Sequence, residues 1–513
     1  MSSGEQKSKL RSMLQDTIYV FLGTYGSQFL SLFISIVLAR KLSTENYGVY
    51  SVVLATYMQG TMILSLGIQP IVQRYLPEFL GTKNRSAVLK IQWLGALSHV
   101  FTGALLVYLC WLFRDALSSW LNIPQFISLL PFFLFFTIFK VEANILEEML
   151  TAHRAQKYRN FVLVGFQALK LFLFLWFLPE EGPIPRAGTL ERLFTFLAIS
   201  NLALMLAFLA RILGLSRNLE DESAEQVQYK RLFRFGLLQY ASSLTLIALY
   251  KDIDTWIISH FQGVEEAGVY RFATSAVTAL VTLVPMHLLL RVIIPVYVKE
   301  YTERKDKNQL VKVFRFYNKV VTSFIVPLLI GALLLATPII SIIFDPKWLP
   351  AVLPFRIYFL AMFMTHYLNT MSFLPLILEK PEITLFSRIF LIYNIILDFI
   401  LIPMEGPFGG AVGAALATGS ALVFGYLLSY TILKRHIAVR FPWMANLKVL
   451  IYGTVMGVAV WLLLERVEGI LSLLGVVALG ALVYLFLAWR FPVFNTEERE
   501  RFNIALGRKI FRT

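Results

Sequence analysis

Several ionisable side chains of this sequence stand inside long apolar stretches, where a charge is costly. A charged residue at the centre of a membrane helix costs on the order of 2.5–3.5 kcal/mol, so it normally faces a cavity, a partner or a ligand. The basic residues in such stretches are Lys140, Lys170, Lys251, Arg271, Arg291 and Arg356. The acidic ones are Glu142, Asp252, Asp254 and Asp398. The basic excess favours an anionic ligand such as a phosphate, which Arg and Lys bind by charge and hydrogen bonding.

Two stripes of polar residues accompany these charges. Thr274, Ser275 and Thr278 follow Arg271 by three, four and seven residues, which places them on one helix face. A second stripe in the first apolar stretch comprises Thr24, Ser27, Gln28, Ser31 and Ser35. The stripes predict the walls of an aqueous cleft, with hydrogen-bonded helix packing as the alternative. The predicted substrate-binding residues are Arg271, Lys170, Lys251, Arg291, Thr274, Ser275, Thr278, Gln28 and Ser31.

The acidic residues suggest a different chemistry. Asn394 and Asp398 are four residues apart on one helix face, and Asp254 follows Lys251 by three, where the two can pair. Asp254, Asp398 and Asn394 are therefore the candidates for coupling to H⁺ or Na⁺. Lys140 precedes Glu147 on one face, which allows an ion pair as well as a substrate contact. No phosphate-binding loop, zinc motif or nucleophile motif is present, so we expect no enzymatic activity, no metal site and no other cofactor.

The composition indicates which elements hold these residues. The 513 residues are 57% apolar and 15% charged, whereas soluble domains average about 45–50% and about 25%. Such hydrophobicity excludes a disordered chain and a soluble core. The net charge of +15 does not indicate a nucleic-acid-binding protein, because such a protein places its basic residues on a polar surface and this chain is mostly apolar. The sequence predicts an all-helical polytopic membrane protein.

The count and orientation of the helices follow from hydropathy and loop charge. About 20 apolar residues cross a membrane. Fourteen stretches qualify: 17–38, 49–73, 91–113, 125–147, 161–179, 193–214, 235–259, 267–296, 318–338, 351–377, 386–403, 410–433, 446–464 and 469–489. Of the 47 basic residues, the predicted outer turns contain only Arg40, Lys41, Arg114, Arg186, Arg192, Lys347 and Arg466. Basic residues concentrate in cytoplasmic loops, so both termini are predicted to be cytoplasmic.

A repeat divides the chain. Gly48-Val49-Tyr50 follows the first helix, and Gly268-Val269-Tyr270 stands at the matching place 220 residues later. The predicted organisation is an N-lobe of six helices (1–215), a cytoplasmic linker (216–234), a C-lobe of six helices (235–436), two further helices (437–490) and a cytoplasmic tail (491–513). Such repeats are common in transporters, with the substrate site between the lobes.

Several of these stretches resemble a known family. Residues 39–51 (Ala-Arg-Lys-Leu-Ser-Thr-Glu-Asn-Tyr-Gly-Val-Tyr-Ser), 66–68 and 74–78 resemble the first turn of polysaccharide transporters, the Wzx-type oligosaccharide flippases. Residues 254–270, 394–403 and 409–418 are similar to later turns of the same family, which belongs to the multidrug/oligosaccharidyl-lipid/polysaccharide exporter superfamily. The resemblance implies two lobes around a V-shaped cavity that opens alternately to each side.

The resemblance also implies a function. The substrate would be an oligosaccharide on a lipid diphosphate, moved from the cytoplasmic to the outer face of the inner (plasma) membrane for surface polysaccharide synthesis. The expected partners are the lipid bilayer and the enzymes that make the polysaccharide, a polymerase and glycosyltransferases. No nucleic-acid partner is expected. Two alternatives are a cation-coupled multidrug antiporter and a lipid II-type flippase. Fourteen helices resemble the latter, but basic residues inside the first two helices, typical of lipid II flippases, are missing here.

Overall fold

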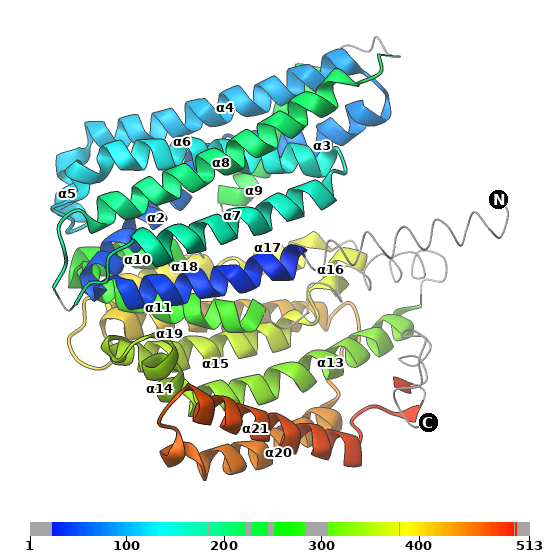
Figure 1. Cartoon of the computed structure of the whole chain (residues 1–513). Coiled ribbons are helices and arrows are strands. Elements are labelled where there is room, and N and C mark those ends of the chain that lie inside the picture. Colours follow the sequence, from blue (N-terminus) through cyan, green and yellow to red (C-terminus); the bar gives the residue numbers. More distant parts are fainter. Residues whose placement is uncertain are drawn as a thin grey trace. The chain divides into compact units, whose positions relative to one another are not determined.

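The computed structural model describes residues 23–182, 184–221, 227–244, 251–282, 306–378, 380–496 and 498–499. These residues form helices and turns and include no strand (Figure 1). Within them, ten helical stretches are long and apolar enough to cross a membrane, or eleven if one bent pair counts as a span. The expectation of an all-helical chain with many membrane helices is confirmed. The number fourteen stays a prediction, because stretches 17–38, 235–259 and 267–296 extend beyond the described residues.

Many apolar side chains lie on the outside of these helices. In α21 (Ile470–Arg490), Leu471, Leu482 and Trp489 are 82%, 65% and 72% exposed. An apolar surface of this extent is unfavourable in water. It fits a helix that faces lipid tails.

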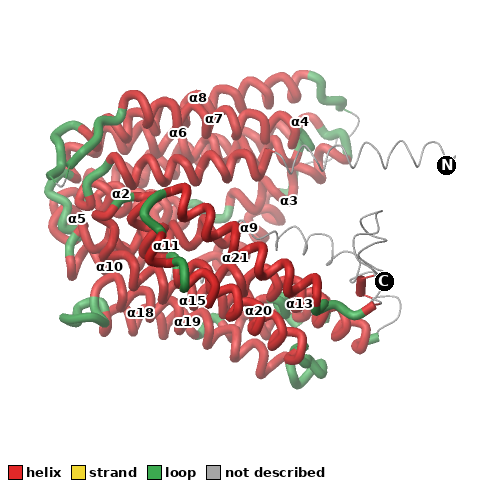
Figure 2. The backbone as a smooth tube through the Cα atoms, turned by 60° about the horizontal axis from the view of Figure 1, so that its bottom comes forward, coloured by secondary structure: helices red, strands yellow, loops and turns green. Residues whose placement is uncertain are grey.

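The chain forms two compact units, Met1–Gly268 and Val269–Thr513. The first begins with a helix over residues 23–41. It continues with α2 (Thr44–Leu64), α3 (Ile68–Gly81), α4 (Arg85–Leu112), α5 (Arg114–Trp120), α6 (Phe126–Ala152), α7 (Gln156–Phe177), α8 (Thr189–Arg217), α9 (Tyr229–Leu244), α10 (Lys251–Gln262) and the first turn of α11 (Val264–Thr282). Helices α4, α6 and α8 lie side by side (Figures 1 and 2). The side chain of Ser43 caps α2 by accepting the amide of Asn46.

The stretch predicted as one helix over residues 49–73 is broken in the structure. Helices α2 and α3 meet at an angle of 62°. Leu66 and Gly67 between them have φ angles of 47° and 74°, which a helix cannot contain. A methyl group on Gly67 would come within 2.1 Å of the carbonyl oxygen of Gly236 in α9. The break therefore lets α3 pack closely against α9.

Replacement of Gly67 with alanine is expected to destabilise the protein by more than about 2 kcal/mol. The left-handed backbone costs an L-residue roughly 1–2 kcal/mol, and the clash with the backbone of Gly236 adds to that cost. Thermal unfolding of the purified protein measures the effect. Gly188→Ala is the control, because Gly188 has a φ of 81° but no neighbour within 4 Å of the added methyl. Equal destabilisation by both variants would show that the contact with α9 contributes nothing.

The second unit contains the rest of α11 and the later helices. These are α13 (Lys307–Leu334), α14 (Ala336–Pro338), η2 (Ile339–Phe344), η3 (Pro346–Ala351), α15 (Val352–Asn369), α16 (Phe373–Ile377), α17 (Pro381–Ser387), α18 (Phe390–Leu401), α19 (Gly410–Leu433), α20 (Trp443–Trp461), η4 (Leu464–Arg466) and α21. Helix α19 packs against α15 and α18, while α20 packs against α13 and α21. The buried Trp348 stacks on Phe272 at 4.5 Å between ring centres, which anchors η3 to α11.

Candidate functional site

The first unit contains two interior lysines on neighbouring helices. Lys140 is on α6 and Lys170 is on α7, two helices that pack against each other. Lys170 Nζ lies 4.5 Å from the centre of the Phe166 ring, a cation–π contact. Within the described residues, neither ammonium group forms an ion pair with a carboxylate. Glu147 lies within electrostatic range of Lys140 without contacting it. Two basic side chains that no described carboxylate contacts are suited to bind a doubly charged anion.

The acidic residue expected near Lys140 has another partner. Glu147 Oε1 accepts a hydrogen bond from Arg159 Nε at 3.0 Å, so the ion pair at this end of α6 is with α7. Asn144 donates to the hydroxyl of Tyr57 at 3.2 Å. Neither of these hydrogen bonds involves Lys140. The sequence alone favoured neither an ion pair of Lys140 with Glu147 nor a contact of Lys140 with substrate. Arg159 is a basic residue in the first turn of α7, but the sequence does not show that this turn packs against the end of α6.

Part of the polar stripe of the first helix is hydrogen-bonded to the backbone of that helix. Ser27 Oγ donates to the carbonyl of Thr24, and Ser35 Oγ donates to the carbonyl of Ser31. Gln28 is exposed and Ser31 is half-buried. Gln28 therefore offers the most accessible polar group of this stripe.

The stripe on α11 divides in a similar way. Thr274 is fully buried and donates to the carbonyl oxygens of Tyr270 and Arg271. Arg271 and Ser275 are half-buried, whereas Thr278 is exposed and donates to the carbonyl of Thr274. Thr274 thus has a packing role, whereas Arg271, Ser275 and Thr278 are at least partly accessible. Arg291 and the side chain of Lys251 lie outside the described residues.

The acidic candidates lie in both units. On α18, Asn394 and Asp398 are fully buried, and Asn394 Nδ2 donates to Asp398 Oδ2 at 2.8 Å. The four-residue spacing thus brings them together as expected. Asp254, on α10 of the first unit, is also buried. The described residues contain no group of three or more acidic, His or Cys side chains that would hold a metal ion.

The two copies of the repeated Gly-Val-Tyr motif come together in the first unit. A methyl group on Gly48 would lie 1.9 Å from the carbonyl oxygen of Val264, and one on Gly268 would lie 3.0 Å from Gly48 Cα. Thr44 Oγ1 donates to Glu265 Oε1 at 2.5 Å beside this crossing. Only glycine permits so close an approach of the two backbones. The repeat therefore marks a contact, which its position in the sequence did not reveal.

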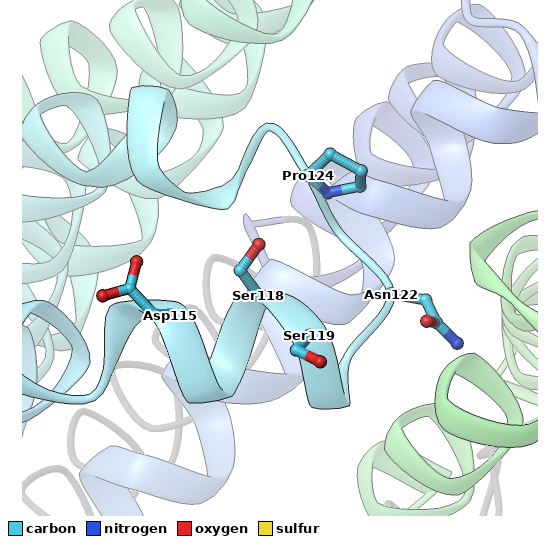
Figure 3. A pocket seen from close by; sticks show the side chains of 5 residues that line it. All are labelled: Asp115, Ser118, Ser119, Asn122 and Pro124. Carbon is cyan, nitrogen blue, oxygen red and sulfur yellow. The ribbon is translucent and has the colours of Figure 1, made fainter.

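Further contacts join α10 to the N-terminal helices at the same end. Asn122 Nδ2 donates to the carbonyl oxygens of Ser259 and His260, each at 2.9 Å. Trp256 Nε1 donates to Thr56 Oγ1 at 3.1 Å. Asn122 also lines a small open pocket with Asp115, Ser118, Ser119 and Pro124, at the turn between α5 and α6 (Figure 3). Its amide group is thus committed to α10, and the pocket has no basic side chain.

Glu181 joins the turn after α7 to the start of α2. Its carboxylate accepts hydrogen bonds from the Ser43 amide (2.8 Å), the Asn46 side chain (2.7 Å) and the Arg186 amide (3.0 Å). Burial raises the pKa of this carboxyl, but the hydrogen bonds to its charged form outweigh burial and hold the pKa below its usual 4.5. Lys41 Nζ donates to the carbonyl oxygens of Leu175 and Leu178 nearby, at the carboxyl end of α7.

The contribution of Glu181 to stability is expected to depend on pH. Its pKa is lower in the folded than in the unfolded protein, so the contribution is complete above pH 4.5 and is lost as pH falls through the folded value. Glu181→Gln should therefore lower the melting temperature at pH 7 and should narrow its gap to the wild type as the pH falls below 4.5. Glu180→Gln, at an exposed neighbour, should have no effect. A gap that widens in acid would contradict the assignment.

Comparisons with known proteins place this arrangement in a family. A profile of the family described as "Polysaccharide biosynthesis protein" matches residues 13–301, more than half of the chain. No curated protein sequence matches it.

Solved structures show the same fold. The chain superimposes on the lipid II flippase MurJ in an inward closed conformation with a TM-score of 0.68 and 17% identity, covering 96% of this chain and all of the other. An inward-facing multidrug resistance MATE family transporter of the MOP superfamily gives 0.62 and 14%, covering 80% and 95%. A MOP superfamily transporter from Pyrococcus furiosus, whose binding pocket is described as having reverse polarity, gives 0.52 and 15%, covering 82% and 95%.

The fold of these structures is that of multi-pass membrane flippases and transporters, as the hydropathy and the family resemblance predicted. The chain belongs to the polysaccharide biosynthesis protein family.

Proposed function

We propose that this protein is a flippase that moves a lipid-diphosphate-linked oligosaccharide from the cytoplasmic to the outer face of the plasma membrane. The family supports a role in polysaccharide synthesis, and the fold supports a membrane transporter. The single observation that carries the choice of substrate is that two half-buried lysines, Lys140 and Lys170, lie on packed helices of the first unit.

The pair suits a diphosphate for physical reasons. Both lysines are half-buried, and no described carboxylate contacts either ammonium group, so an incoming anion recovers part of the lost solvation. The half-buried Arg271 is a further candidate for the diphosphate, together with Lys251 and Arg291. The sugars would lie along Gln28, Ser31, Ser275 and Thr278, while the lipid tail stays in the bilayer.

The contacts around Gly48 support a mechanism of alternating access. They join the predicted N-lobe to the predicted C-lobe at the end where the first helix turns into α2, which the distribution of basic loops assigns to the outer face. Opening to the outside requires these contacts to separate. The cytoplasmic termini, the boundaries of the lobes and linker, the tail over 491–513 and the partner enzymes are parts of this same proposal.

Deletion of the gene in its native host tests the substrate. We expect the lipid fraction to accumulate a lipid-diphosphate-linked saccharide on the cytoplasmic side, and polymer on the surface to disappear until the gene is restored. Extraction of lipids followed by mass spectrometry measures the intermediate. An unchanged saccharide–lipid pool together with lost drug resistance would overturn the proposal.

A cation-coupled multidrug antiporter is the second candidate, and the buried Asn394–Asp398 pair favours it. A carboxylate and an amide oxygen in a dry interior are ligands for Na⁺, and the carboxylate alone can carry a proton. Under this function, Asp398→Asn abolishes ion-driven drug efflux from loaded cells. Efflux that is absent from the wild type, or equal in both proteins, excludes it. The lipid II-type flippase is tested separately, by whether the gene rescues cells depleted of their own lipid II flippase.

A further inference from the structure

A second cationic site lies far along the chain from the lysine pair, at the end of α19. A cavity of about 620 Å³ opens between α13, the end of α19 and the segment that leads into α20. It is lined by Arg315, Tyr430, Lys434, Ala438, Val439, Arg440, Phe441 and Trp443. All of these residues belong to the second unit, and none is among the predicted substrate-binding residues.

The charged groups of this cavity are all basic. Arg315 comes from α13, while Lys434 and Arg440 come from the segment after α19, and all three are exposed. Lys434 Nζ lies 4.6 Å from the centre of the Tyr430 ring. No described carboxylate forms an ion pair with any of the three. Among the described residues, the cavity thus presents three cations without a paired carboxylate.

The wall of the cavity is a packed aromatic cluster. Phe441 is buried and stacks on Tyr367, with ring centres 5.0 Å apart and an angle of 17° between the planes. Tyr430 and Trp443 flank the same ring at 5.3 and 5.8 Å. Val439 is buried beside it. Because this wall belongs to the hydrophobic core of the unit, the cavity is a preformed feature.

The position of the cavity relates it to the membrane surface. The segment between Leu433 and Trp443 is the turn between two helices that are each apolar enough to span the membrane, so it lies at a membrane face. Trp443 is 68% exposed at the start of α20, which is typical of an aromatic residue at the interface of lipid and water. The basic residues of this turn predict that the face is the cytoplasmic one.

We propose that this cavity binds the phosphate-bearing headgroup of an anionic membrane phospholipid. Basic pockets between membrane helices on the cytoplasmic side are suited to such headgroups. The two guanidinium groups of Arg315 and Arg440 can each donate two hydrogen bonds to phosphate oxygens, and Lys434 adds charge. Trp443 and Tyr430 contact the glycerol and the upper acyl chains at the level where tails meet headgroups.

Native mass spectrometry of the full chain in detergent tests this site, with phosphatidylglycerol and phosphatidylethanolamine as probes. We expect the wild type to retain phosphatidylglycerol in preference to phosphatidylethanolamine. Arg315→Ala/Arg440→Ala should weaken that binding about 30-fold, since each basic residue near anionic lipid contributes about fivefold to binding. The control is Lys312→Ala/Arg435→Ala, which removes the same charge from exposed positions on the same two elements outside the cavity.

Three results would overturn the site. One is equal retention of the two lipids by the wild type. Another is an equal loss of phosphatidylglycerol in the cavity variant and the control, which would reflect net charge alone. The third is displacement of bound lipid by millimolar inorganic phosphate, which would indicate a site for a soluble phosphate compound. Because both variants change only exposed side chains, unchanged thermal unfolding shows that each protein is folded.

Discussion

Simultaneous replacement of Lys140 and Lys170 with alanine is expected to abolish polymer export while the protein level in the membrane stays normal. If each ammonium group makes one charge-assisted hydrogen bond to the diphosphate, the loss of two such bonds weakens binding about 100-fold or more. Surface polymer, measured in a deletion strain that carries the variant gene, reports the effect. Accumulation of the lipid-linked saccharide in the same cells shows that the block is at transport.

The controls separate binding from folding. Removal of an interior cation that no described carboxylate contacts relieves a desolvation cost, so the double variant should be at least as resistant to heat as the wild type. Lys170→Arg keeps the charge and should retain part of the export. Lys90→Ala removes an exposed basic residue of α4 and should export normally. Normal export by the double variant would remove the lysine pair from the substrate site.

A covalent link between residues 44 and 265 is expected to stop export completely and reversibly. Thr44 and Glu265 are in hydrogen-bond contact, so cysteines at these positions can be joined by oxidation or by a short thiol cross-linker. If alternating access requires this contact to open, the link locks the outer end shut. Cys110 is the single native cysteine, so a Cys110→Ser background leaves only the introduced pair. Export is measured before oxidation, after it, and after addition of a reductant.

Single cysteine variants at 44 and at 265 are the matched controls. They should export polymer before and after oxidation, because neither can form the link. Export that persists in the fully cross-linked double variant would show that the contact does not open during transport. That result would contradict the proposed alternating-access mechanism but not the proposed substrate. Normal export by the double lysine variant, in contrast, would contradict the proposed substrate site.

Much of the fold could be predicted because hydropathy is a local property. The stretches predicted over 410–433 and 469–489 correspond to α19 and α21 almost residue for residue. The stretch over 49–73 was different, since apolar residues run through the break between α2 and α3. The bend depends on the left-handed backbone conformation of Leu66 and Gly67 and on the close contact of Gly67 with Gly236. Hydropathy indicates neither of these features.

The candidate site could be predicted only where its partners share a helix. Asn394 and Asp398 are four residues apart, so helical geometry alone brings them together, and the hydrogen bond of 2.8 Å confirms it. The roles of Arg271, Asp254 and Gln28 stay predictions. The choice of Arg159 by Glu147 was not predictable, because the two residues lie on different helices whose packing decides which groups meet.

The sequence by itself determined the class of the protein and most of its apolar helices, since composition, hydropathy and helical spacing act over short distances. Tertiary structure alone decided that the helices of Lys140 and Lys170 pack together, that Gly48 meets Gly268 and that Arg315 joins Arg440 around one cavity. These residues are far apart in sequence. Their meeting depends on how helices pack, which is a sum of many contacts that no single stretch contains.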